Sequence, residues 1–239
     1  MLGKTIIGVD MGGTNIGLGR VEKDQFDKCK SFDISAQGTK EKILEEIINA
    51  IYSVFDEHVA GIGIGVPSLV DVNKGIVYDV QNIPSWDEIH LKDILEEQFG
   101  IPVYVNNDAN CFTVGEKYFG IGKRFSNIVG MTMGTGLGAG IIINNRLYSG
   151  MNCGAGEFGS IPYKDQIIEY YCSGQFFEKV HGTKGHILFE EAKNSNINAL
   201  NIFGEFGYHL GNAIKTILFS VDPEAVSYTH LTLPTILLV

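Results

Sequence analysis

Apolar and polar residues along the first hundred positions alternate in short runs that are separated by two amphipathic segments. Glu41–Phe55 places its apolar side chains at helical spacing, and Leu91–Phe99 predicts a short helix that Gly100 ends. Five apolar runs around these segments predict strands: 4–10, 16–21, 26–34, 60–66 and 101–105. Strands that alternate with helices in this way predict an α/β domain.

The second half of the chain begins with strands and continues with helices. The pattern from Asn127 to Ser149 predicts a meander of antiparallel strands, with a hairpin turn at Asn144–Asn145. We expect loops at 67–86 and 151–160. Helices are predicted at 165–180, 185–192 and 199–219.

The first glycine-rich turn contains Gly12, Gly13 and Thr14 and directly follows a strand that ends in Asp10. Two glycines at a strand end let the backbone approach a ligand and point N–H groups at it, as a phosphate site requires. An acid beside such a turn suits Mg²⁺ or a water molecule bound to it. A plain hairpin turn is an equally good explanation of the two glycines.

The second glycine-rich turn is Gly134-Thr135-Gly136-Leu137-Gly138-Ala139, which satisfies the loose GxGxxG/A pattern of dinucleotide-binding folds. That pattern requires a helix to begin after the glycines, whereas Ile141-Ile142-Ile143 continues as a strand. We therefore interpret the segment as a turn between antiparallel strands and not as a Rossmann loop. The chain also lacks the GxxxxGK[ST] motif of a P-loop.

A polar corner follows the strand at 101–105, where Asn106-Asn107-Asp108-Ala109-Asn110 leads into a helix that ends at Tyr118. A carboxylate at a strand end points into the space above the sheet, and short amides beside it suit a polyhydroxylated ligand. The simpler alternative is that Asp108 only caps the helix. Asn82 and the single Trp of the 67–86 loop also suit a sugar, although a lone Trp is more often a packing residue.

Two glutamates and three histidines complete the set of candidate residues. Glu157 lies in the 151–160 loop and Glu169 in the predicted 165–180 helix, and each has a solvated surface acid as its simpler interpretation. The histidines have no metal-ligand spacing with cysteine or carboxylate: His181, His186 and His209.

Composition and charge exclude several classes of protein. The 239 residues suffice for one large or two modest domains, and 44% are hydrophobic. A net charge of -10 argues against a nucleic-acid partner. Four cysteines without CxxC spacing, together with no recognisable signal peptide, predict a reduced, cytoplasmic protein. No apolar run approaches the about 20 residues that span a membrane.

Four motifs together carry a specific resemblance: IGVDMGGTNIGLG, GVPSLVD, VNNDAN, and GTGLGAGIIINNRLYSG followed by GAGEFG. In this order and spacing the chain resembles the ROK family of sugar kinases and sugar-responsive repressors, from about residue 5 to residue 226. The resemblance implies the actin-like, ribonuclease H-like ATPase fold, with a sugar between two α/β domains and ATP above it. We expect domains at 1–110 and 111–226, the second one truncated.

The resemblance also assigns roles for an ATP-dependent hexose kinase. Asp108 matches the catalytic base, and Asn107, Glu157 and Glu169 match ligands of the sugar hydroxyls. An aspartate that accepts the proton of the attacking hydroxyl, with N–H groups and Mg²⁺ meeting the phosphoryl charge, is coherent chemistry. A homodimer is expected on the same ground. The resemblance implies phosphate contacts at Gly12, Gly13, Thr14, Gly134, Thr135 and Gly136.

Three departures from the family pattern change these expectations. Ser160 stands where many members have a zinc-binding and sugar-binding His, and Pro162–Ile168 leaves no room for their cysteine cluster, so we predict no zinc. The usual preference for glucose or an N-acetylhexosamine is therefore in question. Ser68 replaces a glycine, which is a small change.

The third departure is the segment 227–239, which we predict to be a non-native tail in place of the family's return strand and adenosine loop. On this expectation the chain is a fragment that lacks the adenine side of its nucleotide site. The family's repressors carry a helix-turn-helix before the first phosphate loop, whereas Asp10 is within ten residues of Met1. This position argues against a repressor. A repressor and a non-catalytic sugar-binding fragment are nevertheless the alternatives to a kinase.

Overall fold

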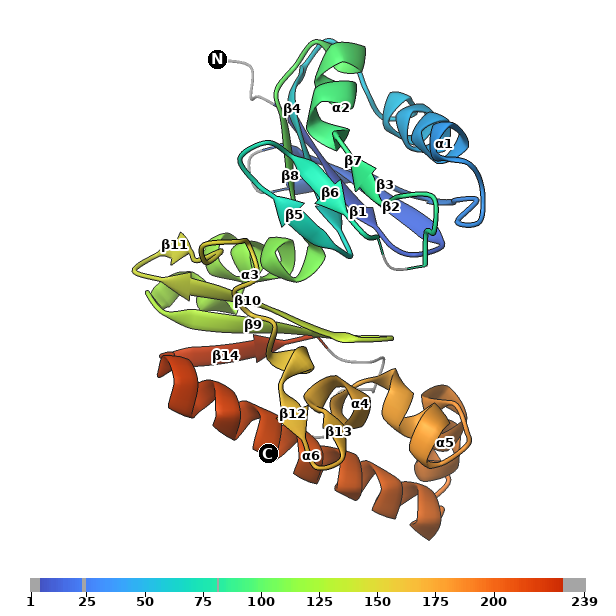
Figure 1. Ribbon diagram of the computed structural model, residues 1–239, viewed down its shortest axis with the longest axis vertical. Coiled ribbons are helices and arrows are strands. Elements are labelled where there is room, and N and C mark those ends of the chain that lie inside the picture. The colour runs from blue at the N-terminus through green and yellow to red at the C-terminus, as the bar shows by residue number, and fades with distance from the viewer. Residues whose placement is uncertain (1–4, 23–24, 81, 230–239) are drawn as a thin grey trace. The chain divides into compact units, whose positions relative to one another are not determined.

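The computed structural model describes residues 5–22, 25–80 and 82–229, with the backbone alone at 25–28. The chain forms two compact units (Figure 1). The first runs to Cys111 and includes Gly150–Gly154, whereas the second comprises Phe112–Ser149 and the chain from Ala155 onward. The grouping of 150–154 with the first unit was not indicated by the sequence.

The first unit is built on a five-stranded sheet whose order is β3-β2-β1-β4-β8. The strands β1, β4 and β8 are parallel, and β2 and β3 run antiparallel to their neighbours. Asp10 of β1 lies opposite Gly65 of β4, which lies opposite Asn106 of β8, so the carboxyl ends of the parallel strands share one edge. The bounds are β1 Thr5–Met11, β2 Asn15–Glu22, β3 Gln25–Asp33, β4 Val59–Val66 and β8 Val103–Asn107.

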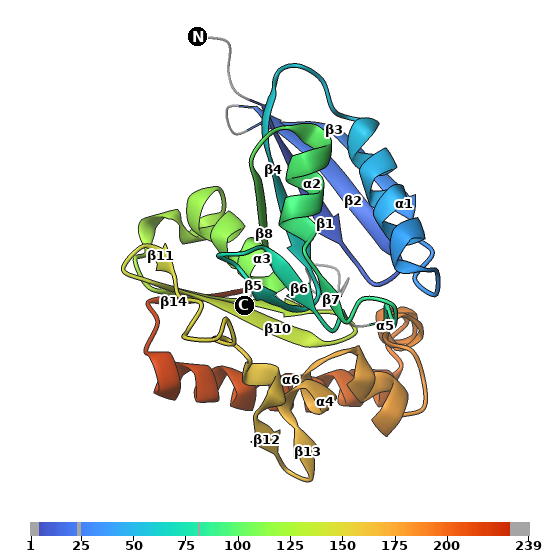
Figure 2. The ribbon, with the colours of Figure 1, turned by 45° about the horizontal axis from the view of Figure 1, so that its top comes forward.

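Two helices cover one face of this sheet, α1 (Lys40–Tyr52) and α2 (Leu91–Phe99) (Figure 2). The Thr39 hydroxyl accepts a hydrogen bond from the Lys42 N–H at the start of α1, and Gly100 ends α2 in the left-handed conformation. Alternate residues of β1 are buried beneath the helices, which explains its apolar run. Burial of these side chains supplies most of the driving force for folding.

The 67–86 segment differs from the predicted loop. It contains β5 (Leu69–Asp71) and β6 (Ile76–Tyr78), which form a small antiparallel sheet with β7 (Glu88–Ile89). The runs are only three residues long, too short for a periodic pattern to reveal them. Trp86 is 1% exposed and belongs to the core, so it is a packing residue.

The second unit contains a four-stranded sheet of order β11-β10-β9-β14. The predicted meander is confirmed, because β9 (Ile128–Met133) and β10 (Leu137–Ile143) are antiparallel and β11 (Arg146–Leu147) follows a tight turn. Asn144 and Asn145 have positive φ values of 51° and 63°, as such a turn requires.

The helix predicted at 165–180 is wrong as a continuous element. Residues 162–167 form a hairpin of β12 (Pro162–Tyr163) and β13 (Gln166–Ile167), with Lys164 at a φ of 54°. A short α4 (Ile168–Cys172) follows and stops where Ser173 is extended, and a π-helical turn occupies Phe176–Val180. The Gly174 N–H leaves the helical pattern because it donates to the Gly134 carbonyl, a tertiary contact that no local pattern indicates.

Two further helices complete the second unit, α5 (Gly185–Lys193) and α6 (Ile197–Val221). The prediction that no strand returns after the last helix is wrong, because β14 (Ala225–Tyr228) pairs in parallel with β9. This strand includes the first two residues of the predicted tail. The Thr229 N–H continues the pairing to the Met131 carbonyl at 2.9 Å. The remainder of the predicted tail, 230–239, lies outside the described residues.

The helix α3 (Asp108–Tyr118) contains the residues at which the first unit ends and the second begins. In the second unit it packs on β9 without an intervening side chain, because a Cβ at Gly130 would lie 2.4 Å from the Thr113 hydroxyl oxygen. No helix in the described part of the chain is both long and apolar enough to cross a membrane.

Replacement of Gly130 by Ala should therefore destabilise the protein by about 1–3 kcal/mol through overpacking. Gly204→Ala is the matched control: no atom lies within 4 Å of the added Cβ, and Ala is favoured over Gly in a helix by about 1 kcal/mol. Urea unfolding of both variants tests this, and an equal response of the two would contradict the close α3–β9 contact.

Candidate active site

The candidate residues form two groups, one in each unit. Each group combines a glycine turn with carboxylates. The group of the first unit contains Asp10, Gly12, Gly13, Thr14, Asn82, Asn107 and Asp108. The group of the second unit contains Gly134, Thr135, Gly136, Glu157 and Glu169.

The corner after β8 is held by asparagine side chains. The Asn107 amide oxygen accepts hydrogen bonds from the backbone N–H groups of Ala109 at 2.9 Å and Asn110 at 3.2 Å, and its NH₂ group donates to the Ser68 carbonyl at 3.2 Å. The Asn106 amide oxygen accepts from the Asn110 NH₂ group at 3.1 Å. Asn107 is therefore the residue that caps α3, which leaves it one N–H for a ligand.

Asp108 is the first residue of α3, and its carboxylate accepts a hydrogen bond from the N–H of Ala109 at 2.8 Å. The strand continues through Asn107, two residues beyond the predicted end, and the helix begins directly after it. A carboxylate in the first turn of a helix is stabilised by the helix dipole. The helix-capping alternative for Asp108 therefore explains only part of the corner, because Asn107 makes the bonds typical of a cap.

Asp108 and Asp10 act on the same neighbour, the Cys111 thiol. Burial raises the pKa of Cys111 to about 12, and the negative charges of Asp108 and Asp10 add to this effect. Part of Cys111 is exposed, but its sulfur is packed on the sheet, since a Cβ at Gly65 would lie 3.3 Å from it. Partial burial also raises the pKa of Asp10, although this residue retains solvent exposure. The two carboxylates thus belong to one electrostatic neighbourhood.

The first glycine turn is a hairpin between β1 and β2, closed by a hydrogen bond from the Gly12 N–H to the Asn15 carbonyl at 2.8 Å. A Cβ at Gly12 would lie 2.8 Å from the Asn15 side-chain oxygen. A Cβ at Gly13 would lie 3.1 Å from the Asn82 amide nitrogen. A side chain at either glycine would therefore require the Asn15 or Asn82 side chain to shift. The fold brings Asn82 beside the turn even though the positions of Gly13 and Asn82 differ by 69 (82 − 13).

The second glycine turn is attached to Glu169. The carboxylate of Glu169 accepts a hydrogen bond from the Leu137 N–H at 2.9 Å, directly after the turn. A Cβ at Gly136 would lie 2.7 Å from the same carboxylate oxygen, and the Gly134 carbonyl accepts from the Gly174 N–H at 2.8 Å. Glu169 is therefore not a solvated surface acid, since it fixes the conformation of the turn.

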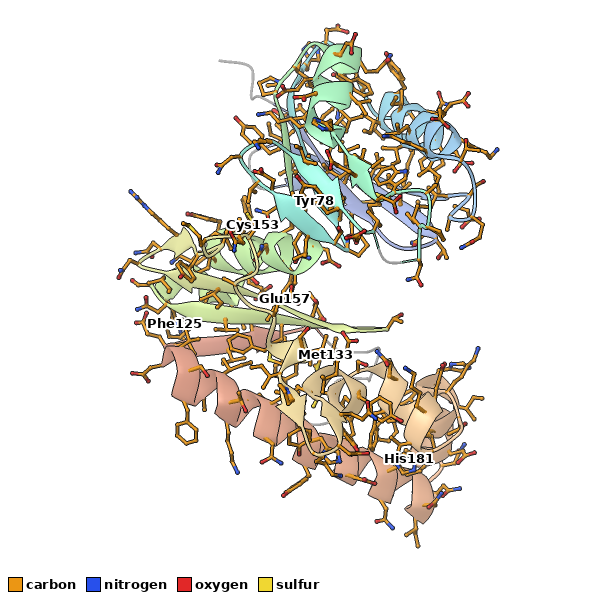
Figure 3. All side chains as sticks on the ribbon, viewed as in Figure 1. Tyr78, Phe125, Met133, Cys153, Glu157 and His181 are labelled. Atoms are coloured by element: carbon orange, nitrogen blue, oxygen red, sulfur yellow. The ribbon has the colours of Figure 1, made fainter. Side chains whose placement is uncertain are left out.

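Glu157 (Figure 3) is an exposed residue whose carboxyl group is partly buried. This partial burial raises its pKa, and the negative charge of Glu169 adds to the effect. The glycines beside Glu157 allow its loop to lie directly on the backbone of β10. A Cβ at Gly156, whose φ is +97°, would lie 2.1 Å from the Ala139 carbonyl oxygen, and one at Gly159 would lie 2.4 Å from that of Leu137. The GxGExG spacing therefore follows from contact with β10.

A cavity of about 320 Å³ adjoins the second glycine turn. Aromatic rings and lysines contribute to its wall, a combination that suits the base and the phosphates of a nucleotide. None of the wall residues outside the turn was predicted, because their spacing in the sequence follows no motif. They are Gly174, Gln175, Phe177, Glu178, Lys179, Lys184, Gly185, His186, Phe189 and Phe203.

Among the described residues, no group of three or more His, Cys, Asp and Glu side chains is arranged to hold a metal ion. The His209 ring is 2% exposed and bonds through Nδ1 to the Tyr163 hydroxyl at 2.9 Å. Its pKa is lowered mainly by burial. His209 is therefore a buried residue that is hydrogen-bonded within the second unit.

Comparison with solved structures identifies the fold as that of the actin-like ATPases. A ROK family glucokinase from Streptomyces griseus, in complex with glucose and AMPPNP, superimposes with a TM-score of 0.82 at 30% identity, over 94% of this chain and 82% of that one. The family match runs over residues 6–228, and the chain belongs to the ROK family. Both the predicted family and the predicted fold are confirmed.

Sequence relatives include both enzymes and regulators. The chain is 37% identical to a glucokinase of Thermotoga maritima over 95% of this chain and 68% of that protein. It is 32% identical to a xylose repressor of Bacillus spizizenii over 70% of this chain, and spans 47% of that repressor's length. The family therefore contains both classes.

Replacement of Asp108 by Asn should lower the pKa of the Cys111 thiol, because one of the two negative charges that raise it is removed. The pKa should stay above that of an ordinary cysteine, since burial is the larger cause. The rate of alkylation against pH measures this in a background where Cys29, Cys153 and Cys172 are Ser. Asp93→Asn, on α2, is the control. An unchanged alkylation profile for Asp108→Asn would show that the Asp108 charge does not act on the Cys111 thiol.

Glu157 should take up a proton at a higher pH than an ordinary glutamate, and Glu169→Gln should move this titration to lower pH. The sign follows because loss of the Glu169 charge makes the ionised form of Glu157 less unfavourable. Carbon NMR of the Glu157 carboxyl group measures the titration. Glu190→Gln, an exposed acid of α5, should leave it unchanged, and an equal shift in both variants would refute the pairing.

Proposed function

We propose that this chain is the sugar- and nucleotide-binding part of an ATP-dependent hexose kinase. The observation that carries the proposal is the shared edge at the carboxyl ends of β1, β4 and β8. There Asp10 lies opposite Gly65, a Cβ at Gly65 would lie 3.4 Å from the Asp108 Cα, and the first glycine turn directly follows β1. A phosphate-sized turn beside a helix-borne carboxylate is what phosphoryl transfer to a hydroxyl requires. The similarity to glucokinases supports it.

Asp108 is the general base in this proposal. Its carboxylate would accept the proton of a sugar hydroxyl while that oxygen attacks the γ-phosphate of ATP. The asparagine bonds around the corner hold the backbone of residues 107–110 in place, so the carboxylate needs little reorganisation during the reaction.

Each group offers candidate ligands for sugar hydroxyls. Asn107 retains one N–H donor, and Asn82 lies beside the first glycine turn. Glu157 and Glu169 are acceptors for sugar hydroxyl groups. Neutral polyols suit this set, because each hydroxyl can donate to a carboxylate and accept from an amide.

In each glycine turn, Gly12–Thr14 and Gly134–Gly136, backbone N–H groups would bind phosphate, other than those of Gly12 and Gly134, which already donate to the Asn15 and Gly136 carbonyls. The base would occupy the cavity beside the second turn. Mg²⁺ bound to ATP needs few protein ligands, so the single carboxylate of Asp10, acting through water, fits its chemistry. When bound, the ion would neutralise phosphate charge. This chain's own contribution would be to orient the phosphates and to present the Asp108 carboxylate.

A coupled assay of ADP release with a panel of hexoses tests the proposal. Asp108→Asn should reduce sugar-dependent turnover at least about a hundredfold, the usual contribution of a general base, while sugar binding changes little. Asp93→Asn is a charge-matched control on α2 and should retain full activity. Circular dichroism of both variants confirms that they are folded.

The outcomes separate the candidate functions. Turnover that is lost in Asp108→Asn but not in Asp93→Asn supports the kinase. Sugar binding by calorimetry without turnover favours the sugar-responsive regulator or the non-catalytic sugar-binding fragment, and the similarity to the xylose repressor makes the regulator the specific alternative. The absence of both turnover and sugar binding would overturn the proposal.

A further inference from the structure

We infer that Gln175 couples the sugar site to the nucleotide site, as the centre of a hydrogen-bonded chain from Glu169 to Lys179. The inference rests on the proposed function, which places sugar at Glu169 and nucleotide in the cavity beside the second glycine turn. Gln175 touches neither reacting group, so it is a positioning residue. Neither Gln175 nor Lys179 belongs to one of the four sequence motifs.

The chain runs through three side chains of the second unit. The Gln175 NH₂ group donates to one carboxylate oxygen of Glu169 at 2.8 Å, and the Lys179 ammonium donates to the Gln175 amide oxygen at 2.6 Å. The other carboxylate oxygen of Glu169 accepts from the Leu137 N–H at 2.9 Å. One carboxylate is thus bonded both to the second glycine turn and, through an amide, to a lysine.

The chemistry of the two partners fixes the orientation of the amide. A carboxylate can only accept and an ammonium can only donate, so the NH₂ group must face Glu169 and the oxygen must face Lys179. The reversed amide would put oxygen against carboxylate and NH₂ against ammonium, which loses both bonds. Gln175 therefore transmits a change at one end to the other, because its two ends cannot rearrange independently.

The far end of the chain reaches the nucleotide side of the site. Gln175 and Lys179 both contribute to the wall of the cavity beside the second glycine turn, together with Gly134 and Thr135. The Lys179 ammonium lies 5.6 Å from the centre of the Tyr170 ring, on the helix that carries Glu169. A cation held at this wall suits the phosphate groups of a nucleotide.

A local irregularity of the backbone makes this chain possible. Gln175 immediately precedes the π-helical turn Phe176–Val180, and the Gly174 N–H is bonded to the Gly134 carbonyl at 2.8 Å. The extended Ser173 separates Gln175 from α4, so its side chain returns to Glu169 across the break. π-Helical turns are frequent at functional sites.

The consequence is a measurable coupling between ligands. A sugar hydroxyl that binds Glu169 changes how strongly this carboxylate holds Gln175, and thereby the position of the Lys179 ammonium. Allosteric coupling of this kind typically changes affinity by about 5–150-fold and must be the same in both directions. We expect ADP to tighten glucose binding, and glucose to tighten ADP binding, by an equal factor of at least about five.

Isothermal titration of the full chain tests this with glucose, or with the tightest-binding hexose of the turnover panel, and with Mg-ADP. Each ligand is titrated alone and in the presence of saturating amounts of the other. Gln175→Met preserves length without the polar ends and should reduce the coupling factor to about one. Because Gln175 also contributes to the cavity wall, the affinity of this variant for each ligand alone is measured as the baseline of the comparison. Gln166→Met, on β13 of the same unit, is the matched control.

Lys179→Met tests the other end of the chain on an exposed side chain whose loss should not affect folding. This variant should weaken ADP binding and also abolish the coupling between the two ligands. If Gln175→Met does not fold, the coupling factor of Lys179→Met alone tests the inference. Wild-type coupling that persists in both variants overturns the inference while leaving the kinase intact. The same holds if both ligands bind without coupling. No binding of either ligand to the wild type overturns the proposed function and this inference with it.

Discussion

Direct backbone contact at glycine positions is the constraint on which the candidate site depends. Gly65 allows the first turn of α3 to lie against β4, where a Cβ would be 3.4 Å from the Cα of Asp108. Gly156 and Gly159 allow the Glu157 loop to lie on β10, and Gly136 leaves room for the Glu169 carboxylate. Asp108 and Glu169 each lie beside a glycine that is distant in sequence, whereas the glycines that seat the Glu157 loop are neighbours of Glu157 in the chain.

The candidate carboxylates of the two units are held in place by different hydrogen bonds. In the first unit the acid is held by its neighbours, because asparagine amides of the corner bond the backbone around Asp108. In the second unit the acid itself makes the bonds, since Glu169 accepts from the Leu137 N–H and from Gln175. Glu169 thereby links the second glycine turn to Gln175, whereas Asp108 accepts a hydrogen bond from its neighbour Ala109.

The sequence was informative wherever a property depends on neighbouring residues. Strand and helix positions followed from periodicity, the Asn144–Asn145 turn from its dipeptide, and the family from four motifs in order. It was not informative for the short strands at 69–78, for the break at Ser173 or for β14. These elements are only a few residues long and are stabilised by pairing with distant segments, which no local pattern records.

The sequence by itself thus determined which chemical groups this protein has and that its carboxylates lie near glycine turns along the chain. Only the tertiary structure decided which groups meet: Asn82 with Gly13, Asp10 and Asp108 around Cys111, and Glu169 with Gln175 and Lys179. The physical reason is that hydrogen bonds and electrostatic effects act over a few ångströms, whereas these partners are separated by up to 101 positions in the chain (111 − 10). Folding of the sheets brings them together.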